Sequence, residues 1–150
     1  MIDLCLTIAH HLLVFATIAV FASELALVRE GMGTPAIRSL RTLDAFYGAL
    51  AALVIVVGFL RVFYGLKVAE FFLLNPLFWG KVSLFVIIGL LSIRPTLTFL
   101  AWGRRLASDP AYSPPTREIR TVRRFFAAQA ILFLALIASA AAMVRGYGLS

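Results

Sequence analysis

Polar and ionisable residues recur at nearly regular spacing along the first apolar segment of this chain. They are Asp3, Thr7, His10, Thr17 and Glu24. Because about seven residues make two turns of an α-helix, these side chains line one stripe of a helix over 2–28. An imidazole can ligate a metal or carry a proton. Since charge in hydrocarbon is costly, we expect the stripe to face neighbouring helices and not lipid.

Four apolar segments are available to position these side chains. The 150 residues are 62% hydrophobic, with a mean hydropathy of +0.98, which is far above a soluble domain. A span needs about 20 residues, and we predict spans at about 2–28, 43–66, 75–102 and 125–143. Open sheet edges cannot sit in lipid. The sequence therefore predicts an all-α fold, a four-helix transmembrane bundle that forms one domain over residues 1–150.

Several residues predict where these helices begin and bend. Asn75-Pro76 reads as an N-cap followed by proline at the first helical position, and Pro115-Thr116 reads as another helix start. Pro95 lies within the third segment and can kink it. We also expect a short interfacial helix at Val68–Leu74.

Arginine residues gather in two of the connections between the predicted spans. The first connection holds three and the third holds six: Arg29, Arg38 and Arg41, then Arg104, Arg105, Arg117, Arg120, Arg123 and Arg124. The positive-inside rule places these connections in the cytoplasm and both termini outside it. We attribute the net charge of +7 to topology and anionic headgroups, and not to nucleic acid. The first segment lacks a basic leader, so we expect it to be retained.

Short sequence blocks carry a resemblance to a known family. They are His10-His11 with Glu24 and Arg29, Arg41-x-x-Asp44-x-x-Tyr47-Gly48, Gly58–Gly65, Asn75–Lys81 and Gly89–Thr96. Together they resemble the uncharacterised bacterial membrane proteins of the domain-of-unknown-function 2214 family. The resemblance spans nearly the whole chain and implies a bacterial inner-membrane location, but it names no activity.

A second resemblance rests on a histidine in the first span and a lysine early in the third. These positions are similar to those of the HemJ-type membrane protoporphyrinogen oxidases, which bind b-type haem. The resemblance implies that His10 (or His11) is the haem-binding histidine and Lys81 the matching lysine. This chain differs from that family in its doubled histidine, in Glu24 and in the Arg61 and Arg94-Pro95 blocks.

Depth in the membrane brings three of these residues to one level. His10 lies about 12 Å and Lys81 about 9 Å below the outer ends of their helices, at 1.5 Å per residue. Arg61 lies near the outer end of the second span. An imidazole can ligate haem iron, while lysine and arginine can pair with propionates. The alternative is structural: His10 as an interhelical hydrogen-bond partner, with Lys81 and Arg61 extending toward water.

Acidic and basic residues also meet at the inner ends of the predicted spans. We expect structural ion pairs among Glu24, Arg94, Arg41 and Asp44. A Glu24–Arg94 pair would fix helix order, or it would serve as a gate or proton relay. On the fourth span, Gln129 and Ser139 are expected to form interhelical hydrogen bonds.

Three functional hypotheses follow from these observations. The first is a haem b membrane redox protein with His10 on iron and Arg61 and Lys81 on carboxylates. The second is a non-enzymatic subunit of a larger membrane complex. The third is a small proton-coupled transporter that uses Glu24, Arg94 and His10, and that forms a homo-oligomer because four spans are few for a transporter. No phosphate loop, nucleophile elbow or H-E-x-x-H zinc spacing occurs in the sequence.

Overall fold

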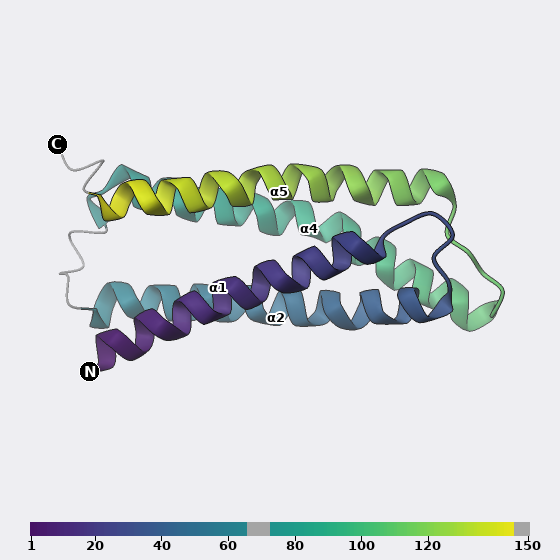
Figure 1. The fold of residues 1–150 in the computed structure, drawn as a ribbon, viewed down its shortest axis with the longest axis horizontal. Helices are drawn as coiled ribbons and strands as arrows, with labels where there is room; N and C mark the ends of the chain where they lie inside the picture. The colour runs from purple at the N-terminus through teal and green to yellow at the C-terminus, as the bar shows by residue number, and fades with distance from the viewer. Residues whose placement is uncertain (66–72, 146–150) are drawn as a thin grey trace.

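Four long helices form the molecule in this computed structural model, which describes residues 1–65 and 73–145 without the side chain of Val144. Their bounds are α1 Ile2–Leu27, α2 Thr34–Tyr64, α4 Pro76–Ser108 and α5 Thr116–Val144 (Figure 1). Each is long and apolar enough to cross a membrane, and the described residues contain no strand. The predicted all-α four-helix membrane fold is therefore confirmed.

Three helices are longer than the spans predicted from hydropathy. Helix α2 begins at Thr34 instead of about 43, α5 begins at Thr116 instead of about 125, and α4 continues to Ser108. Hydropathy marks the part of a helix that suits hydrocarbon, whereas a helix start depends on capping and proline. The helix starts predicted at Asn75-Pro76 and Pro115-Thr116 are confirmed, and the Asn75 side chain accepts a hydrogen bond from Leu77 N at 2.8 Å.

The helices pair as two antiparallel hairpins. Helix α1 packs along α2 and α4 packs along α5, while α2 and α4 make the smaller contact between the hairpins. Figure 1 shows the start of α1, the end of α2, the start of α4 and the end of α5 together, and we call this the terminal end. The connections 28–33 and 109–115 lie at the opposite, arginine-rich end. The interfacial helix predicted at Val68–Leu74 falls, except for its last two residues, outside the described residues.

Aromatic side chains from all four helices form the core. The ring of Phe21 lies 5.4 Å from Phe126 and 5.1 Å from Phe133 of α5, and 6.3 Å from Tyr47 of α2, between ring centroids. Phe99 of α4 lies 6.2 Å from Phe126. Because Phe21 is the α1 residue that reaches both α2 and α5, it joins the two hairpins.

Gln129 and Ser139 of α5 differ in whether their hydrogen bonds reach another helix. Gln129 is fully buried and its Nε2 donates to the carbonyl of Ile88 in α4 at 3.1 Å, as predicted. Ser139 donates instead to the carbonyl of Leu136 in its own helix at 2.8 Å, so its predicted interhelical bond is wrong. A serine hydroxyl can be satisfied by a preceding helical carbonyl and then needs no partner on another helix.

Candidate functional site

The polar stripe of α1 faces the bundle, as its spacing predicts. Thr17 and Glu24 are buried, and three further stripe residues are half-buried: Asp3, Thr7 and His10. The other side of α1 is apolar and exposed, at Leu4, Ile8, Leu12 and Phe15. Helix α1 thus has a lipid face and a polar face directed at its neighbours.

The imidazole of His10 packs against Gly58 of α2. A Cβ built on Gly58 would stand 3.3 Å from His10 Cε1 and 3.7 Å from Nδ1. This Nδ1 is buried and has no hydrogen-bond partner among the described residues. His11 differs, because it is exposed and its Nδ1 lies 2.7 Å from the carbonyl of Thr7. His10 is therefore the histidine with an unsatisfied buried ring nitrogen.

Two cationic side chains lie within electrostatic range of His10. The charges of Arg61 on α2 and Lys81 on α4 both act on the imidazole, and Arg61 also acts on Lys81. Both cations are half-buried, and the Nε atom of Arg61 is buried without a hydrogen-bond partner. The three predicted residues thus lie on three helices at one end of the bundle, and their role as a common site stays a prediction. We call His10, Arg61 and Lys81 the terminal-end site.

A small apolar cluster lies at the same end of the bundle. It consists of Val62 of α2, Phe78 of α4 and Met143 of α5, all of them buried. Phe78 also lies 6.0 Å below the Nζ of Lys81, measured to the ring centroid. Met143 therefore packs among apolar side chains.

Glu24 and Asp44 form a second polar cluster nearer the arginine-rich end. Glu24 is 2% exposed, and its Oε1 has no hydrogen-bond partner among the described residues. Tyr47 lies one helical turn after Asp44 on α2, and its ring lies 6.3 Å from that of Phe21, which lies one turn before Glu24 on α1. Asp44 accepts a hydrogen bond from the Thr96 hydroxyl at 2.8 Å. Two carboxyl groups from α1 and α2 thus share one region of the interior.

The structure does not bring the four predicted ion-pair residues together as pairs. In the part of the chain that the structure describes, the ion pairs join Arg105 to Glu118 at 2.9 Å and Arg120 to Glu30 at 3.8 Å. Arg41 instead lies across Gly103 of α4, with its Nε 2.7 Å from the position of a Cβ there. Arg94 is exposed and lies on the side of α4 that faces α5. Long arginine side chains can extend toward water, so sharing a depth with Glu24 or Asp44 does not make Arg94 or Arg41 their partners.

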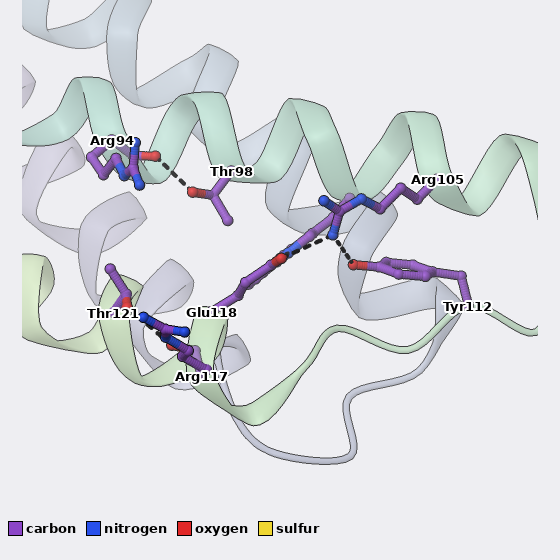
Figure 2. A network of polar contacts seen from close by, with 8 residues as sticks. Arg94, Thr98, Arg105, Tyr112, Arg117, Glu118 and Thr121 are labelled. Carbon is purple, nitrogen blue, oxygen red and sulfur yellow. Dashed lines mark hydrogen bonds and ion pairs between the residues drawn. The ribbon is translucent and has the colours of Figure 1, made fainter.

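The predictions did not include a polar network between α4 and α5. Trp102 donates from Nε1 to Glu118 Oε2 at 2.6 Å. Arg105 donates to Glu118 Oε1 at 2.9 Å (Figure 2). Arg105 also donates to the Tyr112 hydroxyl at 3.0 Å. The sequence does carry a signal for this network. Glu118 lies in the first turn of α5, and its partners Trp102 and Arg105 lie near the end of the preceding helix.

A separate contact ties the last helix to the first. The guanidinium of Arg123 on α5 donates to the carbonyl of Val28, directly after α1, at 2.8 Å. Cations favour the carbonyl end of a helix because its last carbonyl groups lack intrahelical partners. This bond fixes the end of α1 against α5.

These features define the class of protein as a four-helix integral membrane protein with buried polar positions. The chain belongs to the family described as Predicted membrane protein (DUF2214), which matches residues 2–148. No curated protein and no solved structure matches the chain. The family resemblance expected from the sequence blocks is confirmed, and the resemblance to the HemJ-type oxidases stays a prediction.

Proposed function

We propose that this protein is a membrane redox protein that binds a b-type haem at the terminal-end site. The observation that carries the proposal is the buried, unsatisfied Nδ1 of His10 with two cations in electrostatic range. Buried polar groups in proteins are nearly always hydrogen-bonded, so an exception calls for a ligand or a partner. The resemblance to HemJ-type oxidases, which rests on His10 and Lys81, supports the same assignment.

The residues present fit the chemistry of a haem. Within the described residues, no group of three or more His, Cys, Asp or Glu side chains could hold a bare metal ion. A haem needs less from the protein, because the porphyrin supplies four nitrogen ligands and one imidazole can complete an axial position. Arg61 and Lys81 carry the charge that propionate groups require. When bound, a haem would supply one-electron transfer.

The chain's own residues would set the conditions at this site. Gly58 leaves room for the imidazole of His10 against α2, since a side chain there would crowd the ring. Arg61 and Lys81 would orient carboxylates, and their mutual repulsion would fall when an anionic group lies between them. The apolar cluster of Val62, Phe78 and Met143 packs three helices together at this end and keeps water out of its interior.

An absorption spectrum of the detergent-purified protein tests the proposal. We expect a Soret band from protein produced with haem precursors, and we expect His10→Ala to abolish it. His11→Ala is the matched control, because its exposed ring is already hydrogen-bonded to the backbone. Absence of a Soret band from the native chain, or an unchanged band in His10→Ala, would reject the assignment.

We further propose that the protein lies in the bacterial cytoplasmic membrane with both termini in the periplasm. The connections 28–33 and 109–115, with the helix ends beside them, carry most of the arginine residues. Such connections remain in the cytoplasm during insertion. The terminal-end site would then lie in the periplasmic half of the bilayer.

A second candidate function rests on a different observation, the cluster of Glu24 and Asp44. Ionisable residues buried in a membrane interior commonly mark proton pathways, and Glu24 has an unsatisfied carboxyl oxygen. In that case an oligomer of the protein would carry out proton-coupled transport. Measurement of pH-driven flux in liposomes tests this role: Glu24→Gln should abolish the flux, and a flux that survives the substitution would exclude Glu24 as the carrier.

A further inference from the structure

An open groove lies between α4 and α5 at the arginine-rich end. Its volume is about 530 Å³. Helix α4 contributes Arg94, Thr98 and Arg105, and α5 contributes Arg117, Glu118 and Thr121 (Figure 2). The groove therefore has guanidinium groups on both of its walls. Neither proposed function uses it.

The charge of this groove is positive and only partly compensated. Glu118 is its one carboxylate among the described lining residues, and both of its oxygens are engaged, by Trp102 and by Arg105. Arg94 and Arg117 form no ion pair with any residue that the structure describes. Two guanidinium groups, one on each wall, thus remain without a counter-charge.

The depth of the groove matches the headgroup layer of a bilayer. Arg94 lies eighteen residues after the start of α4, which is about 27 Å along the helix. Arg117 lies twenty-seven residues before the end of α5, or about 40 Å. The hydrocarbon core is about 30 Å thick and the whole bilayer about 40–45 Å. If the core starts at the terminal end, the groove extends from the edge of the hydrocarbon into the headgroups.

The surface beside the groove is apolar on the α4 side and basic on the α5 side. Leu97 lines the groove and is 54% exposed, and Leu100 nearby is 44% exposed, so acyl chains can reach its α4 wall. On α5, a second hollow shares Arg117 and Thr121 with the groove and adds Arg120 and Arg124. A basic groove with exposed leucine side chains beside it suits a molecule with an anionic head and an apolar tail.

We infer that this groove binds the phosphate group of an anionic phospholipid between Arg94 and Arg117. Guanidinium groups present paired N–H donors that match phosphate oxygens, and basic pockets between membrane helices bind lipid headgroups. Arg105 is held in place by Glu118 and Tyr112 and lines the groove about three helical turns beyond Arg94. The hydroxyl groups of Thr98 and Thr121 already donate to backbone carbonyls, so the guanidinium groups supply the donors for the phosphate oxygens.

The test measures lipid binding by native mass spectrometry of the delipidated protein in detergent. The probes are short-chain phosphatidylglycerol, phosphatidylcholine of the same chain length, and inorganic phosphate. We expect phosphatidylglycerol to bind at least about ten-fold more tightly than phosphatidylcholine, since the net positive groove favours the anionic head. The double variant Arg94→Gln with Arg117→Gln should remove most of this preference.

A matched double variant controls for the loss of net charge. Arg38→Gln with Arg104→Gln removes two exposed arginine residues at the same end but outside the groove, and it should retain the preference for phosphatidylglycerol. Thr121→Glu, which adds a carboxylate to the wall, should weaken binding without removing an arginine.

Three results would overturn the assignment. They are equal affinity for the two lipids, equal losses in the two double variants, and displacement of phosphatidylglycerol by equimolar inorganic phosphate. The last result would assign the groove to a free phosphate group instead of a lipid. Circular dichroism of each variant checks that the exposed substitutions leave the helices intact.

Discussion

Replacing Gly58 by alanine tests the contact on which the terminal-end site depends. The new methyl group would stand 3.3 Å from His10 Cε1, whereas carbon atoms prefer about 3.5–4.0 Å. His10 must therefore shift by a few tenths of an ångström. A side chain forced well off its rotamer costs about 0.5–1.5 kcal/mol, while glycine to alanine within a helix gains about 0.5–1 kcal/mol.

Gly48 on the same helix provides the matched control. A Cβ at Gly48 meets nothing within 4 Å, so Gly48→Ala should receive the helical gain alone. We expect Gly58→Ala to be less stable than Gly48→Ala by about 0.5–1.5 kcal/mol. Gly58→Leu should lose about 1–3 kcal/mol because it overfills the contact.

The assay is denaturant-induced unfolding of the purified protein in mixed micelles, followed by circular dichroism. The Soret band of the haem-loaded protein gives a second readout, which should shift in Gly58→Ala and stay fixed in Gly48→Ala. Equal stabilities of the two alanine variants would refute the reasoning, because His10 would then not rest on Gly58.

Two further predictions concern the core and the orientation. Phe21→Ala should lower the free energy of unfolding by about 3–5 kcal/mol, because Phe21 contacts rings on α2 and α5. Phe15 is 66% exposed on the lipid face, so the control Phe15→Ala should change this free energy by at most about 0.5 kcal/mol. Similar losses in the two variants would contradict the packing described. Ala111→Cys in a Cys5→Ser background should react with a membrane-impermeant maleimide only after cells are permeabilised, and labelling of intact cells would reverse the proposed topology.

Hydropathy and capping residues predicted the fold because they act locally. The apolar runs located the four helices, and Asn75-Pro76 and Pro115-Thr116 located two of their starts. The missed turns of α2, α4 and α5 lie at the arginine-rich end, where a helix continues beyond hydrocarbon and its composition turns polar. In that region hydropathy no longer reports helix length.

Two residues on different helices form a site only if they share a depth in the membrane and their side chains point toward each other. The direction of a side chain is harder to predict from sequence than its depth. The depth argument placed His10, Arg61 and Lys81 at one level, and the structure brings them within electrostatic range. The same argument placed Glu24 level with Arg94, but Arg94 lies on the side of α4 that faces α5. Successive helical residues differ by about 100° in direction. A helix whose rotation about its axis is misjudged by one or two residues therefore turns a side chain away from the partner that a shared depth would predict.

The pairing of helices into two hairpins has a consequence for how the protein is made. Helices α1 and α2 emerge from the ribosome first and can enter the bilayer together, with His10 of the α1 stripe packed against α2. The contacts of Phe21 with α5, of Thr96 with Asp44 and of Arg123 with Val28 all join one hairpin to the other. The contacts of Phe21 and Arg123 form only after α5 has been synthesised, and the bond between Thr96 and Asp44 forms only after α4 has been synthesised. These three contacts therefore report the joining of the two hairpins, so a chain stalled on the ribosome after α2 should insert its first hairpin and yet lack all of them.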